Sequence, residues 1–242
     1  MAVAPGAGIA GGPASMETEV PEHEILLGRA TTHLAPVGGD ILLHHQLVAP
    51  FGALCALARA RGIDLAVASG YRGFERQLLI WNAKARGDRA VLDDSGRAVE
   101  LDRLSDRDKV FAILRWSALP GASRHHWGTD MDVWDRAAVP AQYALQLVAE
   151  EYGPSGPFAR LAAWLASDEV AALGFYRPYD EDRGGVAPEP WHLSFRPVAE
   201  HFASHLTRDL LAGVIPHSGM VLGDTVLAHL DEIFARFVRC PG

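Results

Sequence analysis

The chain has 242 residues, of which 49% are hydrophobic and 21% are charged, a balance typical of a globular protein with a core. Its net charge of −8 argues against a nucleic-acid-binding protein, which usually presents a basic face. No apolar run reaches the about 20 residues that a membrane-spanning helix needs. Two cysteines, Cys55 and Cys240, do not make a disulfide framework.

Residues 1–22 are predicted to be a disordered extension, because Gly, Ala and Pro dominate them and no periodicity is present. They contain neither the basic stretch nor the apolar stretch of a signal peptide. Taken literally, this predicts a cytoplasmic protein, whereas a chain whose leader had been removed would be periplasmic and would look the same. Residues 23–242 are predicted to form one domain that ends in helices.

Hydrophobic periodicity predicts helices alternating with short strands, and therefore an α+β fold. Apolar residues at helical spacing indicate helices over 48–61, from 74 to about 87, from 106 to about 119 and over 158–172, and two more after residue 198. Alternating patterns indicate strands over 63–69, 129–134, 174–179 and 190–195. Ser105 and Asp108 have the pattern of an N-cap pair. Residues 88–104 are predicted to be a polar loop or hairpin, and residues 136–157 an excursion over the surface.

Residues 121–135, GASRHHWGTDMDVWD, concentrate groups that could bind a metal ion. In an alternating strand, Asp130 and Asp132 point to the same side, where carboxylates are costly to bury unless they are paired or bound to a metal. His125 lies in the loop that enters this strand. A catalytic zinc ion needs three protein ligands and an open position, and His192, at the start of another predicted strand, is a candidate for the third ligand.

Glu189 stands three positions before His192 and directly before Pro190, which tends to mark the beginning of a strand. The carboxylate can therefore come from the loop edge and lean over the metal, where it could take a proton from zinc-bound water. The helical HExxH motif is absent, which excludes that class of metallopeptidase.

Three segments together resemble a known family. Ser123-x-His125-x-x-Gly128-x-Asp130-x-Asp132, followed by Glu189-x-Trp191-His192, is similar to the SxHxxGxxxD and ExWH signature of the D-alanyl-D-alanine carboxypeptidase (VanY-like) zinc peptidases. These belong to the LAS group, with lysostaphin-type enzymes and the hedgehog fold. SGYRGFERQ at 69–77 resembles an upstream segment of the family. The likeness covers roughly residues 40–196, and Asp130 stands where the family commonly has a small apolar residue.

The resemblance implies a small antiparallel sheet flanked by helices, of the hedgehog/DD-peptidase type. It also implies one Zn²⁺ per chain, bound by His125, Asp132 and His192. Glu189 would be the general base and would later protonate the leaving amine. Arg72 would stabilise the oxyanion or hold the substrate carboxylate; the alternative is an ordinary surface ion pair.

Further roles are implied around these residues. Ser123 and Gln77 would help to position the peptide, and Tyr71 is expected to contact it too. Asp130 would accept a hydrogen bond that orients a ligand histidine, or would be a solvated carboxylate. Trp191 would pack around the site.

The implied reaction is amide hydrolysis of a peptidoglycan-derived stem peptide near its C-terminal D-alanine. A D-alanyl-D-alanine carboxypeptidase is the first choice. An L,D-carboxypeptidase or a stem-peptide endopeptidase is the alternative, because the zinc motif does not set the cleavage position. A non-catalytic module that binds zinc and peptide is a third possibility, against which the presence of Glu189 counts. A thiol enzyme is disfavoured, since Cys55 lies in an apolar helical pattern without a motif partner. The sequence does not indicate an oligomeric state.

Overall fold

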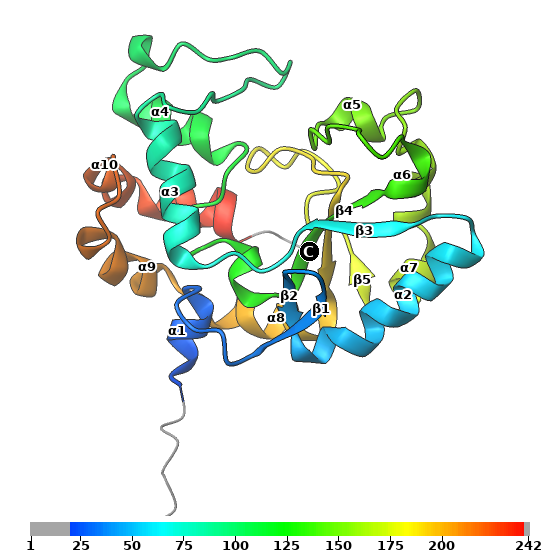
Figure 1. The fold of residues 1–242 in the computed structure, drawn as a ribbon. Helices are drawn as coiled ribbons and strands as arrows, with labels where there is room; N and C mark the ends of the chain where they lie inside the picture. The colour runs from blue at the N-terminus through cyan, green and yellow to red at the C-terminus, as the bar shows by residue number, and fades with distance from the viewer. Residues whose placement is uncertain (1–19, 240–242) are drawn as a thin grey trace, which may run out of the picture.

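The computed structural model describes residues 20–239 of the chain (Figure 1). Most of the predicted disordered extension and Cys240 lie outside these residues. Helix α1 (Glu22–Leu26) begins one residue before the predicted domain boundary. No helix among the described residues has both the length and the apolar character needed to cross a membrane.

The centre of the fold is a four-stranded antiparallel sheet with the strand order β3–β4–β6–β5. Its strands are β3 (Leu65–Ser69), β4 (Asp130–Asp135), β5 (Phe175–Tyr176) and β6 (His192–Phe195). The predicted α+β class with a small antiparallel sheet is confirmed. Three strands, β3, β5 and β6, are shorter than predicted. In β5 and β6 the predicted ranges include Pro178 and Pro190, which have no N–H to donate to a neighbouring strand.

A second sheet is a hairpin that the sequence did not predict. It pairs β1 (Leu34–Gly38) with β2 (Ile41–His44), and Pro36 lies inside its first strand. The hairpin packs on the loop before β4, where His44 N donates to Gly128 O at 2.8 Å. Gly128 has φ +67°, and a Cβ atom there would lie 2.6 Å from the side chain of Leu34. The close approach therefore requires glycine.

The first two long helices match their predictions, and the third begins as predicted but ends at Leu114 instead of near residue 119. They are α2 (Val48–Ala60), α3 (Phe74–Ala85) and α4 (Asp106–Leu114). Ser105 caps α4, since its side chain accepts a hydrogen bond from Asp108 N. The polar region 88–104 holds one isolated β-bridge, between Leu92 and Ala98, and a short 3-10 turn. The surface excursion 136–157 holds the short helix α5 (Ala149–Tyr152).

The helix predictions for residues 158–172 and for the C-terminal part were wrong. Residues 158–172 form α6 (Ala159–Leu165) and α7 (Asp168–Ala172), because Ser167 adopts an extended conformation between them. After β6, the chain forms four short helices instead of two: α8 (Arg196–His205), α9 (Arg208–Val214), α10 (Gly223–Ala228) and α11 (Leu230–Ile233), with a π-helical turn over Phe234–Val238. Thr207 starts α9 by capping Leu210 N, and Leu222 interrupts the path to α10 with φ +64°.

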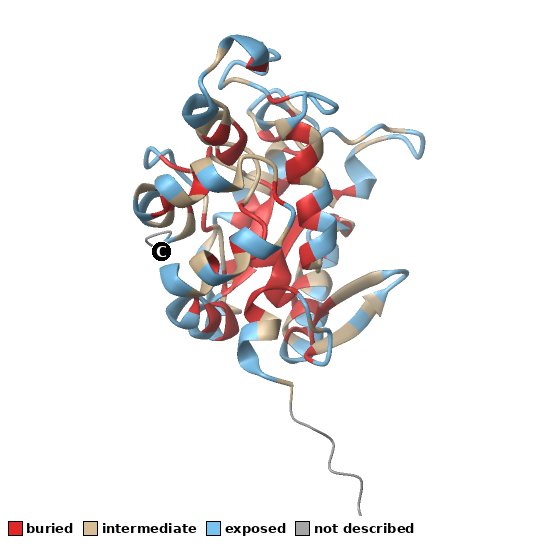
Figure 2. Cartoon of the chain, turned by 90° about the vertical axis from the view of Figure 1, so that its left-hand side faces the viewer, coloured by how far each residue is buried: buried red, intermediate tan, exposed pale blue. Residues whose placement is uncertain are grey.

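The helices lie on both sides of the sheet. In Figure 1, α3, α4, α9 and α10 gather on the left, while α2, α5 and α6 lie on the right. Figure 2 shows the buried residues concentrated on the central strands and on the helix faces turned toward them. One hydrophobic cluster extends from Leu26 in α1 to Phe237 in the last turn. The polar residues of the candidate site are therefore surrounded by the hydrophobic core of the fold.

Candidate metal centre and active site

Three potential metal ligands meet at the start of β4 and β6. His125 lies in a 3-10 turn (Arg124–Trp127), while Asp132 and His192 are paired residues on the two neighbouring strands. His125 Nε2 lies 3.5 Å and His192 Nδ1 lies 3.3 Å from the Asp132 carboxylate. One ligand atom from each residue falls within 4.8 Å of the others, and all three residues are buried. Two imidazoles and a carboxylate in this arrangement fit a zinc ion.

The other ring nitrogen of each histidine is held from outside the ligand group. His125 Nδ1 contacts Gly70 O at 2.8 Å, and His192 Nε2 contacts Asp130 Oδ1 at 3.0 Å. These partners direct His125 Nε2 and His192 Nδ1 toward Asp132, as metal binding requires. Asp130 is fully buried, so the alternative of a solvated carboxylate is wrong. The predicted contact between Asp130 and a ligand histidine is present.

Arg124 is the counter-ion of Asp130, and the sequence interpretation missed it. Its guanidinium donates to Asp130 Oδ1 at 2.7 Å, and it also bonds Tyr176 and Ser194 at 2.8 Å each. Although burial opposes ionisation, the charge of Arg124 and the hydrogen bond from His192 hold the pKa of Asp130 well below its usual value. One indication of such a counter-ion was present in the sequence, because Asp130 would be costly to bury without a partner.

Glu189 and Arg72 are far apart in the sequence, and both lie close to the candidate ligands. Glu189 Oε2 lies 3.2 Å from His192 Nδ1, and Arg72 Nη2 lies 3.9 Å from Asp132 Oδ2. The guanidinium of Arg72 donates to Gln77 and Ser69, both at 3.0 Å. Arg72 is thus held at the site, and the alternative of an ordinary surface ion pair is wrong.

A cavity of about 460 Å³ opens beside these groups. The three candidate ligands, Glu189 and Arg72 line it, and so do the predicted residues Ser123 and Trp191. Gln77 and Tyr71 do not. Gln77 is fully buried against Arg72 and Ala118 O, and Tyr71 donates to Gly28 O at 3.0 Å. The predicted direct contact of these two residues with the peptide is therefore corrected: Gln77 holds Arg72 in place, and Tyr71 ties its loop to the turn after α1.

A comparison with models of protein families shows to which family the chain belongs. The family model VanY, D-alanyl-D-alanine carboxypeptidase, matches residues 40–198, which is more than half of the 242-residue chain. The chain belongs to the VanY family. The match contains all three candidate ligands together with Arg72 and Glu189.

Individual relatives of this VanY-family chain are similar over shorter lengths. Two are uncharacterized proteins of Haemophilus influenzae (strain ATCC 51907 / DSM 11121 / KW20 / Rd). One is 45% identical over 100 residues, which cover 40% of this chain and 68% of the relative. The other is 31% identical over 122 residues, which cover 50% of this chain and 92% of the relative.

The solved structures to which the chain is similar include a vancomycin resistance D,D-pentapeptidase VanY mutant in complex with Zn(II). It is 22% identical, has a TM-score of 0.48, and the match covers 81% of this chain and 92% of that chain. The LD-carboxypeptidase LdcB is 20% identical, with a TM-score of 0.46 and coverage of 85% and 78%.

His126 joins the two loops that carry the VanY motifs in this chain. It is fully buried, and burial lowers its pKa to about 3. Its Nε2 accepts from Gly121 N at 3.1 Å, so its Nδ1 carries the proton and donates to Arg72 O. The ring therefore fixes the backbone of Arg72 against the loop of His125.

Proposed function

We propose that the protein is a zinc-dependent peptidase that hydrolyses peptidoglycan stem peptides, with D-alanyl-D-alanine carboxypeptidase as the first candidate. The observation that carries this proposal is one cavity that joins a buried His–Asp–His group to Glu189 and Arg72. The substrate class is supported by the description of the VanY family, which names D-alanyl-D-alanine carboxypeptidase activity.

His125, Asp132 and His192 would hold the zinc ion. When bound, zinc would polarise the scissile carbonyl and make water more acidic. Glu189 is the carboxylate next to the ligands, and we assign it the transfer of a proton from water to the leaving amine. Its side chain is mostly buried, which limits competition from bulk water.

Arg72 supplies the positive charge for the oxygen of the scissile carbonyl as negative charge develops on it. Gln77 and Ser69 accept hydrogen bonds from the guanidinium, and His126 contacts the backbone of Arg72. These contacts hold the guanidinium in place before substrate arrives. A preorganised donor of this kind typically contributes about 10²–10³ in rate.

The test is hydrolysis of a stem pentapeptide ending in D-Ala-D-Ala, with the products identified by mass spectrometry and the zinc content measured in parallel. Glu189→Gln keeps the shape of the side chain but cannot accept the proton, so we expect it to retain zinc and lose activity. Glu181→Gln is the matched control, because Glu181 is an exposed carboxylate in the same connection between β5 and β6. We expect this control to behave like wild type.

The products also decide the cleavage position. Release of one D-alanine from the pentapeptide supports the D,D-carboxypeptidase. Release of D-alanine only from a tetrapeptide indicates the L,D-carboxypeptidase, and internal cleavage indicates an endopeptidase. If the wild-type protein binds zinc and leaves every stem peptide intact, the peptidase assignment is wrong and the non-catalytic binding module is favoured.

A further inference from the structure

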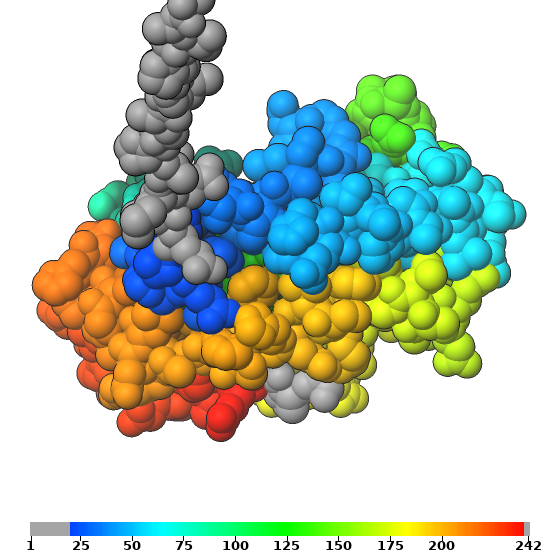
Figure 3. All heavy atoms as spheres, turned by 90° about the horizontal axis from the view of Figure 1, so that it is seen from below, coloured from blue at the N-terminus to red at the C-terminus, as the bar shows by residue number. Residues whose placement is uncertain are grey.

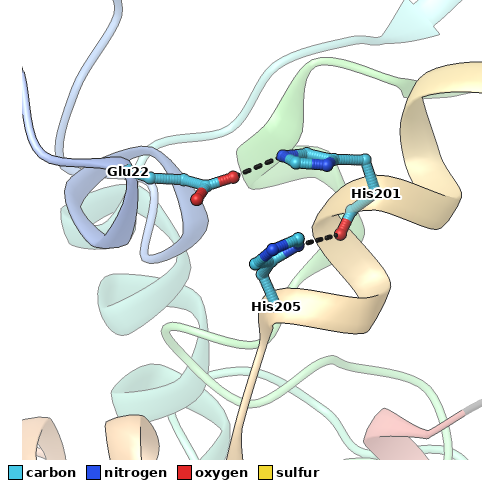
Figure 4. Close-up of side chains that lie close together, drawn as sticks. All are labelled: Glu22, His201 and His205. Atoms are coloured by element: carbon cyan, nitrogen blue, oxygen red, sulfur yellow. Dashed lines mark hydrogen bonds and ion pairs between the residues drawn. The ribbon is translucent and has the colours of Figure 1, made fainter.

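A second group of potential metal ligands lies on the molecular surface, outside the metal cavity. Glu22 is the first residue of α1, and His201 and His205 lie one turn apart on α8 (Figure 4). Ligand atoms of all three residues lie within 4.8 Å of one another, and all three residues are exposed. None of them lines the cavity. These three residues are the surface group.

The donor types and the spacing of the surface group suit a transition-metal ion. Histidines four positions apart on a helix lie on one face and can bind the same ion. The rings of His201 and His205 accordingly have centroids 4.3 Å apart. Glu22 adds a carboxylate, which lies 2.5 Å from His201 Nε2. Two imidazoles with one carboxylate favour Zn²⁺ over Mg²⁺, which prefers oxygen ligands.

A neighbouring pair of the same residue types shows what distinguishes the surface group. His23 Nε2 lies 3.3 Å from Glu24 Oε1, and both residues belong to α1. No third potential ligand among residues 20–239 completes this pair. The surface group instead has three donors, and its residues Glu22 and His201 are 179 positions apart. An ion bound there would therefore connect two distant segments of the chain.

The orientation of His205 supports metal binding. Its Nδ1 lies 2.8 Å from His201 O, as a dashed line in Figure 4 shows, and 3.2 Å from Ser204 Oγ. The hydroxyl proton of Ser204 is donated to the same carbonyl oxygen, so both neighbours of Nδ1 can accept its proton. A proton on Nδ1 leaves the lone pair of Nε2 free for a metal, and ligand histidines commonly donate their other N–H to a carbonyl.

The exposed side chains of the surface group can adjust to an ion. The side chain of His201 is 54% exposed and that of Glu22 is 43% exposed. Donor atoms of a tetrahedral zinc ion lie about 3.3 Å apart, so these two side chains would separate by about 1 Å. Rotation of exposed side chains can supply this movement while the backbone stays in place. Their exposure also lets water occupy the fourth position.

The position of α1 gives such a site a consequence. Figure 3 shows α1, in blue, beside the orange and yellow-orange helices of the C-terminal part. Carbonyl groups at the end of α1 hold both motif loops: Leu26 O accepts from Trp127 Nε1 at 3.3 Å, and Gly28 O accepts from Phe74 N at 2.8 Å. Because α1 has only five residues, its helical structure depends on packing against the rest of the fold.

We propose that Glu22, His201 and His205 bind a zinc ion that fastens α1 to α8. The ion suppresses local unfolding of α1. It does not take part in the chemistry of the cavity, since the surface group lies outside it.

Zinc titration of the full chain, followed by native mass spectrometry, counts the bound ions. Wild type should bind one ion more than His205→Ala, whether or not the buried group is also loaded. Glu22→Gln removes the charge of the donor on the other helix and keeps its shape, so it should bind this ion more weakly. His23→Ala is the matched control, because it removes an exposed histidine of α1 that lies outside the surface group. It should bind as many ions as wild type.

Hydrogen exchange tests whether the ion fastens α1. The backbone N–H groups of Leu27, Gly28 and Arg29 donate to carbonyl groups of α1 and report on its unfolding. An ion that binds only the docked helix slows their exchange by about 100-fold when free zinc is 100 times its dissociation constant. Wild type and His23→Ala should show this effect, and His205→Ala should not. Mg²⁺ should not produce it.

Two results would overturn the surface site. One is a His205→Ala protein that binds as many zinc ions as wild type. The other is a zinc effect on exchange in α1 that is absent from wild type or equally large in His205→Ala. Thermal unfolding without zinc checks that each variant folds, and Glu22→Gln answers the same question from the other helix. Neither readout uses hydrolysis, so the site can fail or stand independently of the proposed function.

Discussion

Within residues 20–239, two groups each combine two imidazoles with one carboxylate, and they differ in what surrounds them. His125, Asp132 and His192 are buried on a loop and two paired strands, and both imidazoles are held by further acceptors. The surface group lies on two helices, is exposed, and only His205 has its other ring nitrogen held by a carbonyl. Ligand identity alone therefore does not distinguish a catalytic from a structural metal site. The neighbours that hold the ligands, and the acid, base and cavity beside them, make the difference.

The largest expected effect comes from removing one histidine from each group. His192→Ala should abolish zinc binding at the buried site and reduce peptide hydrolysis to background, because both the metal and the orientation of Asp132 depend on it. His205→Ala should leave hydrolysis unchanged when zinc is saturating. Initial rates and bound zinc, measured on both variants, check this. Equal losses of activity would show that the two groups are not functionally distinct.

A smaller effect is expected from the residue that orients His192. Asp130→Asn should weaken zinc binding at the buried site by about 10- to 100-fold, as for other acceptors behind a metal ligand. Competition with a chelator measures this affinity. Asp135→Asn is the matched control, since Asp135 is a buried carboxylate on the same strand that caps Ala137 N and accepts from Asp64 N. This control should lower thermal stability and leave zinc affinity unchanged; equal affinities for both variants would remove the assigned role of Asp130.

The smallest effect concerns buried histidines that have no carboxylate beside them. Burial, with the charge of nearby histidines, lowers the pKa of His33 and of His44 to about 4. The folded state therefore binds fewer protons than the unfolded chain between pH 6.5 and 4, so their stabilising contribution is fully present above about pH 6.5 and is lost as the pH falls toward 4.

Unfolding temperatures at pH 7, 5.5 and 4.5 measure this contribution. His33→Phe should reduce the acid-induced decrease in Tm by a few degrees, since each kcal/mol corresponds to about 2–4 °C in a chain of this size. His217→Ala is the control, because its histidine is exposed in the folded state. An identical decrease in wild type and His33→Phe would show that the protonation of His33 does not limit acid stability.

Local sequence patterns predicted the elements that are determined by residues close together in the chain. The helix over 74–85 and the cap at Ser105 depend on neighbouring residues and were predicted correctly. The β1–β2 hairpin was missed because Pro36 interrupts its pattern and its packing partner is the distant Gly128. Too few C-terminal helices were predicted, because the cap at Thr207 and the left-handed conformation of Leu222 break the helices without interrupting the apolar pattern.

The candidate site also contains features that the sequence predicted and features that it did not. The motif residues predicted the candidate ligands that the structure brings together, because their chemistry is rare and their spacing is specific. Arg124 and His126 were not predicted, since each depends on a partner that is brought close only by folding: Ser194 for Arg124 and Arg72 O for His126. Gln77 was assigned to the peptide, because a sequence does not reveal that a polar residue is fully buried.

The sequence by itself therefore determined the α+β class, the family and the identity of the candidate zinc ligands, since periodicity and motif spacing are properties of short segments. Only the tertiary structure decided which polar side chains reach the cavity and which of them hold others in place. The physical reason is that burial and electrostatic pairing depend on residues far apart in the chain, and their distances are set when the strands pair and the helices pack.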